Sequence, residues 1–281
     1  MRLALEDLYM AIPYYHVDAF TSELFAGNPA GVCILSGFPA DRVMQKIAVE
    51  NRHSNTAFVV ARADGDFDLR WFTAKIEDDL CGHATLASAY VLALRKHSAW
   101  PVRFHTRSGV LTVARDASAQ GKDRFEMDFP ARPPQACETP VGLLPALGLK
   151  GMDLKAARVT KSRDYFVVVD QAEQVQALAP DVAALAKLEI GTSGAIVSAP
   201  GEGEVDYVCR FFAPSIGIDE DPATGSIHCT LAPYWAEQLG KDRLRAQQLS
   251  ARGGTMQCTI CGGRVKIGGS ARLYLQGTLE L

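Results

Sequence analysis

The chain has 281 residues, of which 48 % are hydrophobic and 22 % charged, and its formal net charge is −3. This composition is typical of a globular protein of about two domains. So small a net charge excludes binding to nucleic acid or to an anionic membrane through a strong positive field, and no apolar stretch reaches the roughly 20 residues of a membrane-spanning helix.

The first half is predicted to consist of short strands and two helices. Apolar residues recur at helical spacing between Val43 and Ala48, so a helix is expected over residues 41–51. A longer helix is expected over residues 82–97, because little interrupts it and the basic residues 95–97 suit a negative C-terminal end. Strands are expected at residues 14–20, 31–35, 56–61, 67–72, 102–105, 110–114 and 125–129.

A proline-rich segment, residues 130–134, is predicted to separate two domains. Beyond it, helices are expected over residues 181–186 and 225–239, and Pro233 should kink the longer helix or end its first part. Strands are expected at residues 163–169, 194–199, 205–212, 256–260, 264–267 and 271–279. The predicted fold class is α+β, with two mostly antiparallel sheets that each wrap one long apolar helix.

One short pattern occurs twice. An aromatic strand end and an acidic loop lead to Cys81-Gly82-His83 in the first copy and to Thr224-Gly225-Ser226 in the second, and an apolar run follows each. Because the N–H groups at a helix start lack acceptors and carry partial positive charge, each turn is predicted to attract an anion. We expect the two turns to face one cleft, about 10 Å apart, and to hold a carboxylate or a developing oxyanion between them.

Several side chains near these turns could move a proton. The candidates are His83, Asp221, Glu220, Cys81 and Asp79. Asp221 before a proline could instead be a turn residue, and His83 a polar residue of the first helical turn. A helix N-terminus should lower the pKa of the Cys81 thiol. The matching residue of the second copy is Thr224, a poor proton carrier, which disfavours a racemase with two symmetric cysteines.

Seven cysteines are scattered along the chain, an odd number in a sequence too long to need disulfides for stability. Cys258 and Cys261 have the spacing of half a zinc site, but no second pair or nearby histidine completes it, so both are predicted to be ordinary strand residues. The first nine residues lack the basic start and apolar core of a signal peptide. We therefore expect reduced thiols and a cytoplasmic protein.

Four motifs resemble those of the phenazine-biosynthesis isomerase family (PhzF-like), which shares its fold with diaminopimelate epimerase. The resemblance extends over nearly all of the chain from about residue 14, and Arg252-Gly253-Gly254 fits it too. The motifs are His16-Val17-Asp18-Ala19-Phe20-Thr21, Phe25-Ala26-Gly27-Asn28-Pro29-Ala30, Leu80-Cys81-Gly82-His83-Ala84-Thr85 and Asp219-Glu220-Asp221-Pro222-Ala223-Thr224-Gly225-Ser226.

The resemblance implies two pseudo-symmetric domains of the diaminopimelate epimerase-like fold. We expect the first domain at residues 10–131, joined by the C-terminal strand at residues 270–281, and the second at residues 132–269. The resemblance also implies no cofactor, no metal and a homodimer. The characterised activity of the family is a proton shift in a dihydro-hydroxyanthranilate, so the expected partner is a small, cyclic or open, carboxylic acid.

Position by position, the resemblance places His83 and Asp221 on active-site residues and Gly82, Gly225 and Ser226 on substrate-binding residues; Cys81 and Thr224 are expected to bind substrate beside them. One departure affects the catalytic set. The family's proton-shuttling glutamate of a Ser-Glu-Thr motif is Asn55 here, and an amide cannot carry a proton at neutral pH. Three alternatives remain: an altered isomerase, epimerase or lyase with Asn55 binding the substrate, the family's own chemistry through another acid, and a non-catalytic protein that binds small carboxylates.

Overall fold

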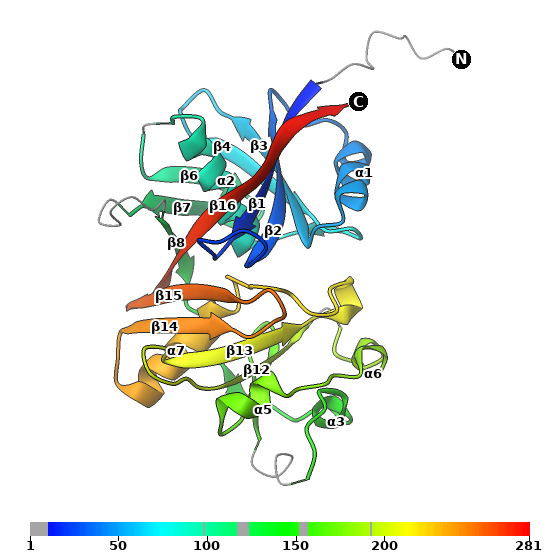
Figure 1. Cartoon of the computed structure of the whole chain (residues 1–281), viewed down its shortest axis with the longest axis vertical. Coiled ribbons are helices and arrows are strands. Elements are labelled where there is room, and N and C mark those ends of the chain that lie inside the picture. Colours follow the sequence, from blue (N-terminus) through cyan, green and yellow to red (C-terminus); the bar gives the residue numbers. More distant parts are fainter. Residues whose placement is uncertain (1–10, 98, 117–123, 152–156, 192) are drawn as a thin grey trace.

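The computed structural model describes residues 11–97, 99–116, 124–151, 157–191 and 193–281. Its strands form two halves, each curved around one central helix (Figure 1). The elements of the first half are β1 (Ala11–Ala19), β2 (Asn28–Leu35), α1 (Asp41–Asn51), β3 (Asn55–Ala61), β4 (Phe67–Phe72), β5 (Glu77–Asp78), α2 (Gly82–Leu94), β6 (Val102–Thr106), β7 (Gly109–Arg115) and β8 (Arg124–Pro130).

The second half has more short helices. Its elements are β9 (Gln135–Ala136), α3 (Leu143–Ala146), β10 (Arg158–Lys161), β11 (Tyr165–Val168), α5 (Ala172–Gln176), α6 (Val182–Ala186), β12 (Ala195–Pro200), β13 (Tyr207–Phe212), the 3₁₀ turn η2 (Pro214–Ile216), α7 (His228–Leu239), β14 (Arg243–Gln248), β15 (Gly254–Cys261) and β16 (Arg264–Glu280).

Strand β16 joins the two halves. Its first part pairs with β8 and β15, and from Ala271 onward it pairs with β1, as far as Glu280 opposite Ala11. The two strands expected at residues 264–267 and 271–279 are therefore one continuous strand, and every main strand lies in one hydrogen-bonded path. Since β16 belongs to both halves, the division into domains at residues 131 and 132 stays a prediction.

Helix α2 is the core of the first half. Its residues from Gly82 to Leu92 are all buried, which is typical of a helix that is apolar on every side. The helix ends at Leu94, earlier than expected, and Lys96 beyond it has a positive φ of 62°. The basic residues that seemed to belong to its last turn thus lie in the loop that follows.

Helix α7 is the core of the second half, and it begins at His228 rather than at Gly225. Pro233 neither ends nor interrupts it, although a proline deprives the carbonyl four residues earlier of its hydrogen bond. Here that carbonyl belongs to Cys229, and the backbone N–H of Arg132 in the connecting segment donates to it at 2.8 Å. The connection between the halves therefore compensates for the proline.

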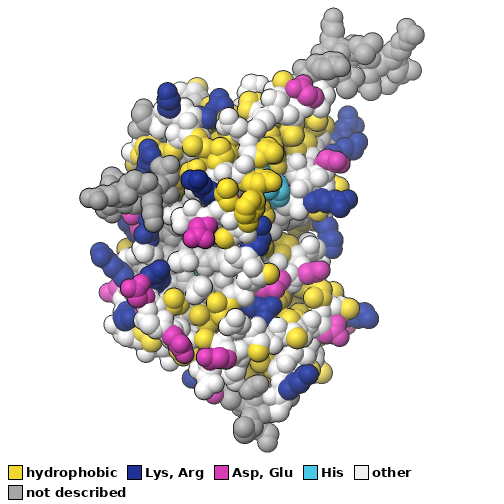
Figure 2. All heavy atoms as spheres, viewed as in Figure 1, with side chains coloured by type: hydrophobic (Ala, Val, Ile, Leu, Met, Phe, Trp, Pro, Cys, Tyr) yellow, Lys and Arg dark blue, Asp and Glu magenta, His cyan; other side chains and the backbone are white. Residues whose placement is uncertain are grey.

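The surface shows no block of one charge on the face in Figure 2, where basic and acidic side chains alternate. In the part of the chain that the structure describes, no helix is long and apolar enough to cross a membrane.

Candidate active site

The two repeated turns meet where the halves join. A Cβ atom built on Gly82 would lie 3.0 Å from Cα of Gly225 and 3.2 Å from the backbone nitrogen of Ser226. The turns face each other as expected, but the predicted gap of about 10 Å is wrong, because their backbones are in contact. Only glycine allows this approach, and a ligand must lie beside the contact rather than between the turns.

Each turn leads into a central helix. Cys81 precedes α2, so the N–H groups of Gly82 and His83 have no acceptor within the helix. In the second half, the turn of residues 225–227 precedes α7, with the N–H groups of His228 and Cys229 donating back to it. Two helix starts of the same polarity thus converge, as an anion site requires.

One cavity adjoins both turns. Its interior is about 40 Å³, on the order of the ~30 Å³ that one liquid water occupies, so the conformation is closed and a substrate requires its walls to separate. The lining residues are Asn55, Asp78, Leu80, Cys81, Gly82, His83, Arg163, Asp164, Phe211, Ile216, Ile218, Asp221, Thr224, Gly225 and Ser226. All eight site residues expected from the sequence are among them: Asn55, Cys81, Gly82, His83, Asp221, Thr224, Gly225 and Ser226.

Asp221 is held by donors from both halves. Its Oδ1 accepts a hydrogen bond from Nδ2 of Asn28 at 2.8 Å, and its Oδ2 accepts one from the Thr224 hydroxyl at 2.5 Å. Ser54 donates to the same carboxyl group. Burial raises the pKa of Asp221 from 3.8 to about 6, against the opposing effect of these three donors.

The side chain of Gln248, at the end of β14, binds the backbone of the second turn. Its Oε1 accepts the N–H of Thr224 at 2.7 Å, and its Nε2 donates to the carbonyl of Asp221 at 2.6 Å. No local sequence pattern indicates this role, because the contact joins residues in separate elements. A second positioning residue, Arg252, donates to Asp18 and to the carbonyl of Gly27 across the halves.

Cys81 and His83 form a buried pair at the first turn. Sγ of Cys81 lies 3.4 Å from Nδ1 of His83. Burial raises the pKa of the Cys81 thiol well above its ordinary value, reinforced by the nearby charge of Asp78, and the helix start does not reverse this. The expectation of a lowered thiol pKa is therefore wrong. Burial also lowers the pKa of His83 to about 3, so its imidazole is neutral at pH 7.

Asn55 contacts a carboxyl group that was not singled out from the sequence. Its Nδ2 donates to Oδ2 of Asp78 at 3.3 Å, and the N–H of Leu80 donates to Oδ1 at 3.3 Å. Burial raises the pKa of Asp78, while the charge of Arg163 opposes that shift. Aligning the two copies of the repeat on their glycines would have identified Asp78, since it matches Asp221.

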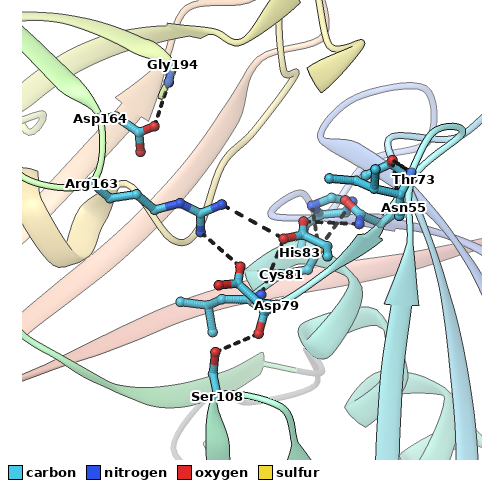
Figure 3. A network of polar contacts seen from close by, with 12 residues as sticks. Asn55, Thr73, Asp79, Cys81, His83, Ser108, Arg163, Asp164 and Gly194 are labelled. Carbon is cyan, nitrogen blue, oxygen red and sulfur yellow. Dashed lines mark hydrogen bonds and ion pairs between the residues drawn. The ribbon is translucent and has the colours of Figure 1, made fainter. Parts of the chain in front are cut away.

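Arg163 and Asp164 bring the β10–β11 turn to the cavity. Figure 3 shows the Arg163 side chain reaching from the second half to the first, where it lies 3.8 Å from Asp79 and 3.9 Å from Asp78. Asp164 accepts the N–H of Gly194 at 2.7 Å, and burial raises its pKa. Arg163 is the one basic side chain among the lining residues, so it is the one available cation for a substrate carboxylate there.

Outside the cavity, one group within the described ranges brings three metal-ligand atoms within 4.8 Å, namely Asp64, Asp66 and His105. Arg62 and Arg103 pair with the same carboxylates and oppose cation binding. Cys258 and Cys261 both lie in β15, one buried and one exposed, in agreement with their prediction as strand residues.

Several known proteins resemble this chain over most of its length. The sequence profile of the family described as phenazine biosynthesis-like protein, PhzC-PhzF, matches residues 17–278. An uncharacterized isomerase of Pseudomonas aeruginosa is 50 % identical over 273 residues, covering 97 % of this chain and all of that protein. A PhzF-family crystal structure from Enterococcus faecalis is 41 % identical with a TM-score of 0.87, covering 97 % of this chain and all of that one.

A more distant likeness concerns the fold alone. A probable proline racemase from Agrobacterium radiobacter, at 11 % identity, superposes with a TM-score of 0.64 over 96 % of this chain and 93 % of its own. The predicted fold class, α+β of the diaminopimelate epimerase-like type, is thus confirmed. With its matching profile and its isomerase relatives, the chain belongs to the PhzF-like family of phenazine biosynthesis-like proteins.

Proposed function

We propose that this protein is an isomerase or epimerase that transfers a proton between carbon atoms of a small carboxylic acid, bound at the cavity beside the Gly82 and Gly225 turns. One observation carries the proposal: a single cavity joins two helix starts with carboxyl groups from both halves, Asp78 from the first and Asp164 and Asp221 from the second. Membership in a family with isomerases supports the same reaction class.

The geometry suits carbon-acid chemistry. When a proton leaves the carbon next to a carboxylate, the electron pair spreads onto the carboxylate oxygens as an enolate. Backbone N–H groups aimed at that charge stabilise it, and one such donor is worth about 3 kcal/mol. His83, neutral at pH 7, adds a hydrogen-bond donor without adding charge. Burial strengthens each of these contacts because little water screens them.

The reaction can be tested by following exchange of substrate C–H protons with deuterated water by NMR. The panel contains proline, lactate, aspartate and a dihydro-hydroxyanthranilate. Exchange is expected for at least one member of the panel. His83→Gln and Asp221→Asn should each slow it by about 100-fold or more, the scale of acid–base and oxyanion contributions. Asp219→Asn is the matched control, because Asp219 is exposed, near Asp221, and does not line the cavity.

A second function is favoured by one observation, the amide of Asn55 where a proton-carrying acid is expected. A protein that binds small carboxylates without catalysis would show ligand-dependent rises in melting temperature and no exchange in any panel member. Exchange by the wild type would exclude this alternative.

We also propose that the protein forms a homodimer. Hydrophobic side chains gather over the upper half of the molecule in Figure 2, and those of Leu24, Phe25, Tyr274 and Leu275 are exposed. Phe25 and Tyr274 contact each other with ring centroids 5.8 Å apart. Light scattering after gel filtration should give twice the chain mass, and Phe25→Asp should reduce it to one chain if this patch is the interface.

A cytoplasmic location is part of the same proposal. All seven cysteines are free, and five of them are buried, as expected of a protein from a reducing compartment. Cell fractionation of the native host would test it directly.

A further inference from the structure

We infer that Asp78 is a catalytic residue of this site, which accepts the proton from the substrate carbon and returns it. This inference rests on the proposed function and names the group that moves the proton. It assigns to a carboxyl group beside Asn55 the task that the amide of Asn55 cannot perform.

In the internal repeat, Asp78 corresponds to Asp221. With the glycines of the two turns aligned, Glu77 and Asp78 match Glu220 and Asp221. The structure supports this match at the preceding residue. Arg70 binds Glu77 through two hydrogen bonds of 2.7 Å, and Arg210 binds Glu220 through bonds of 2.7 and 2.9 Å. The aspartate that follows each glutamate lines the shared cavity.

Each aspartate also accepts a hydrogen bond from an asparagine of the first half. Asn28 donates to Asp221 and Asn55 donates to Asp78. The bonds differ in length. Both oxygens of Asp221 are engaged at 2.8 Å or less, whereas those of Asp78 accept at 3.3 Å. Asp78 therefore retains the freer lone pairs, which a base needs in order to reach a carbon-bound proton.

The other lining groups fit this task less well. Cys81 stays a neutral thiol at pH 7, because burial and the adjacent carboxylate both oppose its ionisation. His83 is neutral and sits against the Cys81 sulfur. Asp164 already accepts a short hydrogen bond of 2.7 Å from the Gly194 N–H. Asp78 has the cation Arg163 within 3.9 Å, whose charge favours the ionised carboxylate that can accept a proton.

The step is a simple proton transfer. The C–H bond of the substrate breaks, its electron pair remains on the substrate as an enolate, and the proton forms an O–H bond with the Asp78 carboxylate. That O–H bond then breaks to protonate another carbon of the conjugated system. Asp78 returns to its ionised form, so no further reactant is needed.

The test compares Asp78→Asn with Asp79→Asn. Both aspartates lie within 3.9 Å of Arg163, but Asp79 is exposed and does not line the cavity. Asp78→Asn should slow NMR-detected exchange of the responsive panel acid by about 100-fold or more, while Asp79→Asn should change it less than about threefold. In the Asp78→Asn background, Asn55→Asp moves the carboxyl group to the other side of the 3.3 Å hydrogen bond. This second substitution should raise the exchange rate at least about tenfold above that of Asp78→Asn alone. Circular dichroism and the affinity for the acid confirm that each variant is folded and binds.

The outcomes separate the two proposals. If the wild type exchanges no proton in any acid of the panel, the proposed isomerase function fails and the role of Asp78 fails with it. If the wild type exchanges and Asp78→Asn exchanges equally fast, the function stands and Asp78 is not the proton carrier. An equal loss in Asp79→Asn also contradicts the inference, because it assigns the effect to the loosened Arg163.

Discussion

In the first half, Arg70 holds Glu77 and lies over the Phe72 ring at 5.3 Å; in the second, Arg210 holds Glu220 and lies over the Phe212 ring at 5.0 Å. The two turns thus have the same kind of support, an arginine that pairs with a glutamate and lies over an aromatic ring. The turns themselves differ, since the first has a thiol and an imidazole where the second has two hydroxyl groups.

This difference separates the residues of the repeat that support the helix starts from those that face the cavity. The ion pair, the aromatic ring and the glycine recur because both helix starts need the same support. Among the side chains that face the cavity, only Asp78 and Asp221 are repeated. An asymmetric pair of turns suits a reaction whose two proton positions are unlike, and it does not suit a racemase that treats both faces of a carbon alike.

Substitutions of Asp221 and Asp78 should differ most in their effect on the stability of the protein. Asp221→Ala is expected to cost about 4 kcal/mol of unfolding free energy, because the donors from Asn28, Thr224 and Ser54 lose a buried acceptor. Asp78→Ala should cost less than about 1 kcal/mol, since its contacts are long. Urea unfolding measures both values, and equal losses would contradict the distinction.

The burial of both residues explains why a substitution should be costly. Only 4 % of His83 and 3 % of Asp221 is exposed. Both residues belong to the closed joint between the halves as much as to the site.

The raised pKa of Asp221 should appear in the pH dependence of stability. Because the folded pKa of about 6 exceeds the ordinary 3.8, the folded state holds this proton more tightly than the unfolded state. The stabilising contribution is complete below about pH 4 and is lost as the pH rises through 6, with a full size of about 3 kcal/mol.

Urea unfolding of the wild type and of Asp221→Asn between pH 4 and 7 isolates this effect. The wild type should lose more stability across that range than the variant does. Asp78 and Asp164 also have raised pKa values, but they are present in both proteins and cancel in the difference. Parallel curves would show that Asp221 titrates normally.

The contact between the two glycines offers a finer comparison. Gly82→Ala directs its Cβ at the backbone of the other turn at 3.0 Å, while Gly225→Ala meets the Phe20 ring at 2.8 Å. Each should cost about 2 kcal/mol through overpacking. Phe20→Leu should relieve Gly225→Ala but not Gly82→Ala in a double-mutant cycle. Gly37→Ala is the control, since nothing lies within 4 Å of its Cβ.

Local patterns in the sequence predicted local structure well. The spacing around Val43 and Ala48 located α1 at its observed bounds, and both repeated glycines line the candidate cavity. Strand β14, with the sequence Arg-Leu-Arg-Ala-Gln-Gln, was missed, because only two of its residues are apolar although its burial alternates. Weak hydrophobic alternation is compensated there by pairing with β13 and β15, which no local pattern reports.

Contacts between distant residues could not be predicted in this way. Asn28 meets Asp221 across 193 positions of the chain, and Gln248 meets Thr224 across 24. The thiol of Cys81 shows the same limit, because its position at a helix start was visible but the burial that dominates its pKa was not. The repeat did contain Asp78, although an acidic loop of three neighbouring carboxylates concealed it.

The smallest expected difference concerns the two supporting arginines. Arg210 donates to the carbonyls of Leu178 at 2.8 Å and Val175 at 3.3 Å as well as to Glu220, so it also satisfies the C-terminal end of α5. The hydrogen bonds of Arg70 go to two carboxylates, Glu77 and the exposed Asp41. Arg210→Met should therefore destabilise the protein by about 1 kcal/mol more than Arg70→Met, because it also removes hydrogen bonds to backbone carbonyls. The midpoints of urea unfolding measure this difference if the free energy of unfolding depends equally steeply on urea in both variants. Hydrogen exchange should locate the additional loss of stability in α5. A larger loss in Arg70→Met would mean that the carboxylate pair, rather than the helix end, determines how firmly each half holds its turn.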